Sequence, residues 1–282
     1  MSHINKILFL ATALTALSAV TASASEMTNT GNSSADASSI LSNLHDNLYL
    51  NYFGIYHGAP LTSLDSTKTV GPTGVPSKTN AINFDSEITA AYMITPSFGI
   101  GPDVPFLAVP VLGQGIILGD VGIKAIDKKT VYKNGLIIST NLYLQAPTSK
   151  ASEARNMDLG IKTTPSIRYT MPGSRITLGA WNEIKEYAGV TSDKTFKLYT
   201  QPYANYQLSK NFSLNLGYEM EWHHNVGYAA ARFTTYQTDL QPGFVWNITP
   251  KVIVNPYIQI FTANAMSTDT AAVGAVISAT AF

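Results

Sequence analysis

Histidines and carboxylates are the residues of this sequence that could support acid–base, nucleophilic or metal chemistry, so their spacing limits what the protein can catalyse. No histidine has a serine two residues further on, the spacing that lets an imidazole activate a hydroxyl on one face of a strand. Asp85 and Glu87 form a carboxylate pair, but no Asp-x-His sequence accompanies it. His223 and His224 have only Glu221 as a carboxylate at ligand spacing. With no phosphate loop or dinucleotide fingerprint either, the sequence predicts no enzyme, no metal site and no cofactor.

A different set of charged side chains predicts a pore. These residues alternate with apolar ones along extended segments, and alternation places them together on one face of a strand. If the apolar faces meet lipid, the polar faces line the lumen of a closed barrel. The residues predicted to line this pore are Asp85, Glu87, Lys124, Lys162, Arg168, Lys197, Glu219, Glu221 and Asp239.

The order of these charges along the chain predicts two opposed arcs around the lumen. Strands four to eight of the set given below carry mainly cations, and strands nine, ten and two carry anions. Such arcs would produce a field across the pore that orders dipolar solutes and penalises apolar ones. The same pattern would be found if these charged side chains served only to neutralise one another within the confined lumen. The sequence leaves both interpretations open.

The elements that must hold these residues are strands. Every second residue from Phe212 to Trp222 is apolar, and the others are polar or glycine, which is the period of a strand and not of a helix. Similar runs predict an all-β protein: a closed antiparallel transmembrane β-barrel of about twelve strands. The predicted spans are 47–57, 81–95, 97–110, 118–133, 135–146, 156–171, 174–188, 194–208, 211–224, 231–247, 251–264 and 270–282.

The connections support a barrel that crosses a membrane. Tight turns such as Lys133-Asn134-Gly135 alternate with longer links such as 58–80 and 223–232, as in barrels with short periplasmic turns and longer outer loops. A soluble β-sandwich or lipocalin-like barrel is the structural alternative. The loop asymmetry, an N-terminal leader and a terminal phenylalanine favour the membrane barrel.

The first residues predict export. Residues 1–24 combine a weakly basic start, an apolar stretch too short to span a bilayer comfortably, and Ala22-Ser23-Ala24, so we expect a cleaved signal peptide. Residues 25–46 are rich in Ser, Asn, Thr and Ala and are interpreted as a periplasmic arm, which leaves 47–282 for the barrel. Phe282 is expected to serve as the signal read by the assembly machinery of the outer membrane.

Composition excludes several other classes of protein. The sequence has 18 Lys and Arg against 18 Asp and Glu, so it lacks the basic surface that nucleic acid requires. It has no cysteine, which rules out disulfides and thiolate metal sites. A closed ladder of hydrogen bonds is then the expected source of stability.

One segment resembles a known family. Gly119-Asp120-Val121-Gly122-Ile123-Lys124, then Ile138–Ala146 and Pro147-Thr148, is similar to the transporter-like barrels of the phenol meta-pathway, distant relatives of the long-chain fatty-acid channels. The Asn-Pro-Ala type hatch motif of the fatty-acid channels has no counterpart in Ser25–Asp46. The resemblance implies transport of hydrophobic compounds.

The function predicted from these features is an outer-membrane channel, porin-like, that passes small polar or charged solutes through a narrow charged lumen. The expected partners are outer-membrane lipid and lipopolysaccharide, small solutes and the assembly machinery. The alternative is a plugged barrel acting as a transporter of hydrophobic compounds, a surface receptor or adhesin, or a structural envelope protein.

Overall fold

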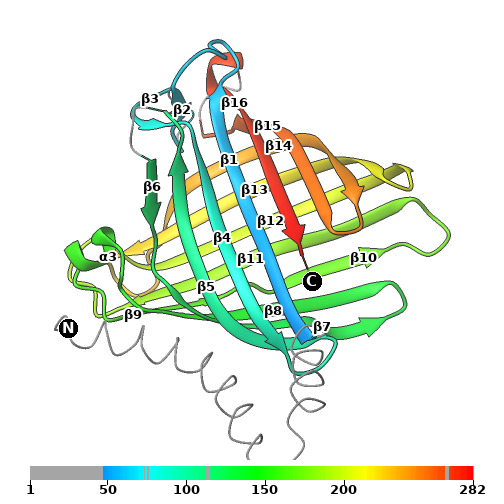
Figure 1. Cartoon of the computed structure of the whole chain (residues 1–282). Coiled ribbons are helices and arrows are strands. Elements are labelled where there is room, and N and C mark those ends of the chain that lie inside the picture. The colour runs from blue at the N-terminus through cyan, green and yellow to red at the C-terminus, as the bar shows by residue number, and fades with distance from the viewer. Residues whose placement is uncertain (1–46, 73, 75, 112–114, 264–266, 282) are drawn as a thin grey trace, which may run out of the picture.

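The chain forms a closed antiparallel β-barrel of twelve strands, as the alternation predicted (Figure 1). This computed structural model describes residues 47–72, 74, 76–111, 115–263 and 267–281. The predicted signal peptide, the arm at 25–46 and Phe282 lie outside the described residues.

Each wall strand pairs with its neighbours in the chain, and the last strand pairs with the first, which closes the barrel. All twelve predicted spans correspond to wall strands, with boundaries within about four residues. The wall consists of β1 (Leu48–Pro60), β4 (Asn83–Met93), β5 (Phe98–Val109), β7 (Gly122–Lys133), β8 (Leu136–Gln145), β9 (Leu159–Thr163) continued by β10 (Ser166–Thr170), β11 (Ile176–Ala188), β12 (Lys194–Ser209), β13 (Phe212–Asn225), β14 (Thr234–Thr249), β15 (Val252–Phe261) and β16 (Ala271–Thr280).

Four prolines, Pro165, Pro202, Pro242 and Pro256, fall inside the predicted strands, where each removes a hydrogen-bond donor from the ladder and suggests a bulge. Pro165 separates β9 from β10, and both pieces pair with β8 and β11. Pro202, Pro242 and Pro256 pair with Ala180, Leu216 and Ala275 without any shift of register. The idea that all four prolines mark bulges is therefore wrong for these three. The ladder accommodates a missing donor there without an extra residue.

Apolar and polar faces alternate as a lipid-facing barrel requires. Leu214 and Leu216 on β13 are 49% and 48% exposed on the outer surface, whereas Asn215 and Gly217, the residue after each of them, line the interior. Tyr169, Tyr206 and Trp246 are exposed near strand ends, where aromatic girdles meet the membrane interfaces. This apolar outer surface is the one that lipid would cover.

The two ends of the barrel differ. One end carries tight turns, such as Asn134-Gly135, whose φ angles of 49° and 82° make the type I′ turn that suits a two-residue hairpin. The other end carries the longer connections (Figure 1). These contain β2 (Lys68–Val70), β3 (Pro76–Ala81), β6 (Gly115–Leu118), the helix α3 (Lys150–Ala154) and the 3-10 turn η2 (Thr268–Thr270). No helix among the described residues is long and apolar enough to cross a membrane.

The loop lengths needed two corrections. The sequence pattern also predicts a longer link at 187–193, and this prediction is wrong, because β11 runs to Ala188 and β12 begins at Lys194. The connection between β5 and β7 is longer than expected, because β6 folds back and pairs with the outer end of β5.

The first long connection folds inward. The antiparallel strands β2 and β3 form a hairpin, in which Val70 packs with Phe261 and Ala272 from the wall. Thr69, Val70 and Pro72 line the interior of the barrel. The sequence left open whether this segment forms a surface or enters the pore, and the structure places part of it at the outer mouth of the lumen.

Candidate functional site

The barrel encloses a polar cavity of about 1130 Å³. Asp239 is fully buried within the wall, behind glutamine side chains that line the cavity. Arg168 is exposed near the end of β10 next to the turn at 171–175 and is not among the residues that line the cavity. The other predicted pore residues lie on the cavity wall: Asp85, Glu87, Lys124, Lys162, Lys197, Glu219 and Glu221.

Lys124 is the centre of the first charge cluster. Its Nζ lies 2.5 Å from Glu87 Oε1 and 3.8 Å from Asp103 Oδ1, and donates to Thr89 Oγ1 at 3.1 Å. Thr89 in turn donates to Asp103 at 2.6 Å. Asp103 and Thr89 are almost fully buried, so this cluster lies within the wall where β4, β5 and β7 meet. Lys162 approaches the same Glu87 at 3.6 Å from the lumen side.

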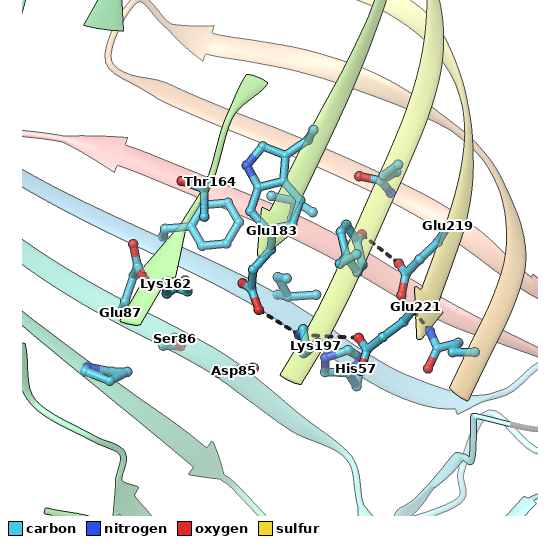
Figure 2. Close-up of a pocket in the computed structure, with 18 of the residues that line it drawn as sticks. His57, Asp85, Ser86, Glu87, Lys162, Thr164, Glu183, Lys197, Glu219 and Glu221 are labelled. Atoms are coloured by element: carbon cyan, nitrogen blue, oxygen red, sulfur yellow. Dashed lines mark hydrogen bonds and ion pairs between the residues drawn. The ribbon is translucent and has the colours of Figure 1, made fainter. Parts of the chain in front are cut away.

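Lys197 organises the second cluster. Figure 2 shows Glu183 and Glu221 reaching Lys197 from two sides, with N–O distances of 2.9 and 3.3 Å. His223 bonds to Glu221 and stacks on the ring of Tyr236 at 4.2 Å between centroids. The ammonium group of Lys197 is therefore held between two carboxylates on the cavity wall.

The third cluster is acidic and contains no cation. Glu219 and Asp239 lie directly opposite one another on β13 and β14. The side-chain amides of Gln237 and Gln241 each donate to both carboxylates, at 2.7–2.8 Å. Tyr199 also donates to Glu219 at 3.0 Å. Amide and phenol donors therefore hold this pair of carboxyl groups in position, with Glu219 on the cavity wall and Asp239 behind it.

Two charged lumen residues on β11, Glu183 and Lys185, were missed from the sequence. Both share the inward parity of Trp181 in the predicted strand 174–188, so the alternation could have found them. The outward-facing Glu186 beside them hid the pattern, because charges then occupy both parities.

The two adjacent histidines, His223 and His224, point apart. His223 faces the wall cluster, whereas His224 contacts Thr195 at 2.6 Å. Both lie at the end of β13 and not in the following loop. Among the residues that the structure describes, no group of three or more histidine and carboxylate side chains could hold a metal ion.

The segment that resembles the phenol meta-pathway barrels forms a latch at the outer end. The Asp120 carboxylate accepts from the backbone N–H of Ser149 at 2.9 Å and from Ser152 Oγ at 2.5 Å, just before and within α3. Thr148 Oγ1 donates to Gly119 O at 3.1 Å and accepts from Val121 N. The Gly-Asp and Pro-Thr pieces therefore join the connection after β8 to the start of β7.

Breaking this latch should loosen the outer connection. Asp120→Ala removes the acceptor of two hydrogen bonds, one of them to a buried serine, at an expected cost of about 1–3 kcal/mol to the local structure. We expect faster trypsin cleavage at Lys150 or Arg155 in detergent-solubilised protein, followed by mass spectrometry. Asp65→Ala, in an exposed loop, is the matched control. Equal cleavage rates in all three proteins would contradict the latch.

Comparisons with known proteins define the class of fold. No protein-family model and no curated protein matches this chain. The solved structure of the COG4313 outer membrane channel from Pseudomonas putida F1 resembles it with a TM-score of 0.52 and 11% identity, over 83% of this chain and 96% of that one. The structure of the NanC porin has a TM-score of 0.44 and 9% identity, over 83% of this chain and 98% of that one. The structure of the KdgM porin in complex with disordered oligogalacturonate has a TM-score of 0.45 and 8% identity, over 83% of this chain and 99% of that one. The likeness to the COG4313 channel concerns the fold, which in this chain is a closed antiparallel β-barrel of twelve strands.

Proposed function

We propose that this protein is an outer-membrane channel that passes small polar or charged solutes through its lumen. The observation that carries the proposal is the wall of the cavity, where charges of both signs face one continuous space between the two ends of the strands. Asp85 is exposed to this space, and no hydrogen bond or ion pair joins it to the described part of the chain. Such a side chain must be solvated, so the cavity holds water.

Its location follows from the same proposal. The exposed apolar band would contact outer-membrane lipid and lipopolysaccharide, residues 1–24 would be removed during export, and Phe282 would be read by the assembly machinery. The channel is proposed as a passage and not as an enzyme.

Conductance tests the proposal directly. We expect the mature protein, residues 25–282, to give discrete ohmic steps in a planar bilayer, because a water-filled lumen conducts salt. The protein should first migrate as a heat-modifiable, folded species on a gel. A folded protein that gives no steps would rule out the open channel and favour the plugged barrel. The same recording after deletion of 25–46 would then show whether that arm is the plug.

A further inference from the structure

A row of lysines crosses the lumen wall. Direct cross-strand pairs connect Lys124 to Tyr143, Tyr143 to Lys162, Lys162 to Lys185, and Lys185 to Lys197. All five residues line the cavity, on the consecutive strands β7, β8, β9, β11 and β12. Because neighbouring strands lie about 4.8 Å apart, the four lysines form a basic track along the wall, which Tyr143 interrupts between Lys124 and Lys162.

Lys185 differs from the other lysines of this track. Lys124, Lys162 and Lys197 each have a carboxylate oxygen within 4.0 Å. Lys185 has no ion pair and no hydrogen bond with any residue that the structure describes. It is also flanked on both sides by lysines directly opposite it, an arrangement of like charges that destabilises a sheet. The flanking lysines are neutralised by Glu87, Glu183 and Glu221, but Lys185 itself has no carboxylate partner among the described residues. An unfavourable local arrangement of this kind is expected at functional sites, and a bound anion would offset it.

The residues towards the outer mouth strengthen this interpretation. The ring of Tyr187, two residues after Lys185, is surrounded by three cations, at 4.9 Å for Lys185, 5.0 Å for Arg155 and 5.6 Å for Lys194. Lys194, like Lys185, has no ion pair within the described residues. Arg155 and Lys194 do not themselves line the cavity, but both lie beside the ring of Tyr187, which does, near the outer end of β11.

We propose that Lys185, with Lys162 and Lys197 beside it and Lys194 at the entrance, forms a binding site for small oxyanions, either carboxylates or phosphates. The proposal deepens the channel function proposed above, because the site would select anionic solutes within the lumen. Lys185 supplies the free ammonium that donates to the bound oxyanion. Glu219 of the acidic cluster lines the cavity on β13, two strands from Lys185, so the lysine side of the cavity ends at β12.

The test is equilibrium binding of citrate and, separately, of inorganic phosphate to the full-length protein extracted from outer membranes, by isothermal titration calorimetry. Lys185→Gln should weaken the binding of whichever anion the wild type binds by about tenfold, the loss expected for one charged hydrogen bond. Lys185→Arg keeps the charge and should retain most of the affinity. Lys210→Gln, in an exposed turn, is the matched control and should behave as the wild type.

Heat-modifiable mobility on a gel verifies that each variant is folded. Affinity lost in Lys185→Gln, kept in Lys185→Arg and unchanged in Lys210→Gln supports the site, and the anion concerned identifies the solute class. No binding by the folded wild type, or equal affinity in Lys185→Gln, overturns it. Conductance recorded in parallel separates the two proposals. A folded protein that binds citrate but gives no conductance would support the anion site and contradict only the open channel.

Discussion

Removal of the β2–β3 hairpin is expected to raise single-channel conductance roughly two- to threefold, because a constriction limits the current through a pore. Thr69, Val70 and Pro72 line the outer part of the cavity, and Val70 packs against Phe261 at the end of the wall strand β15. A Cβ added at Gly74 would lie 2.9 Å from Phe261 Cβ, so the hairpin is seated closely on the wall. Replacing residues 63–80 by a short Gly-Ser linker would open this space and leave every wall strand intact.

A point substitution and a loop control make this experiment specific. Val70→Asp places a charge in the apolar contact with Phe261 and Ala272 and should release the hairpin, with a smaller gain in conductance than the deletion. The connection at 226–233 contributes no residue to the cavity wall, so shortening it should leave conductance unchanged. Equal conductance in the hairpin deletion and the wild type would show that the narrowest part of the pore lies elsewhere.

Alternation predicted the wall because it reflects a local constraint. Each strand such as β13 must present one face to lipid and one to the lumen, and this period can be read from neighbouring residues alone. The same parity placed Glu87, Lys162 and Lys197 on the interior face. What alternation cannot supply is the partner of each charge, since Glu87 and Lys124 are 37 positions apart and meet only when the barrel closes.

Other features depend on tertiary contacts that have no periodic signal. Asp103, the buried partner of Lys124, was not predicted as a site residue, because β5 contains Gly99, Gly101, Pro102 and Pro105 and alternates weakly. A Cβ at Gly101 would lie 1.9 Å from Ala90 O, so glycine there permits a close approach between β4 and β5. The interior position of the β2–β3 hairpin depends likewise on its contact with Phe261, almost two hundred residues away in sequence. Composition shows only that this connection is long and polar.

The largest effect on stability is expected from Lys124→Met. The side chain of Asp103 is 1% exposed, and Lys124 is its only ion-pair partner among the described residues. Methionine would retain much of the volume of the lysine chain but leave that carboxylate buried and unpaired beside Glu87. Breaking a buried ion pair in this way costs about 3–5 kcal/mol. The variant should therefore unfold at a clearly lower urea concentration, measured by tryptophan fluorescence and by heat-modifiable mobility on gels.

A second substitution separates the charge from the packing. Asp103→Asn in the Lys124→Met background removes the unpaired charge, while the amide oxygen can still accept the hydrogen bond that Thr89 makes at 2.6 Å. The double variant should thus recover a large part of the lost stability, since neutralising both partners avoids the desolvation cost of one isolated ion. Lys210→Met, at an exposed turn, controls for the loss of a lysine as such. If the double variant were as unstable as Lys124→Met alone, the lost packing of the lysine chain, and not the isolated Asp103 charge, would be the cause.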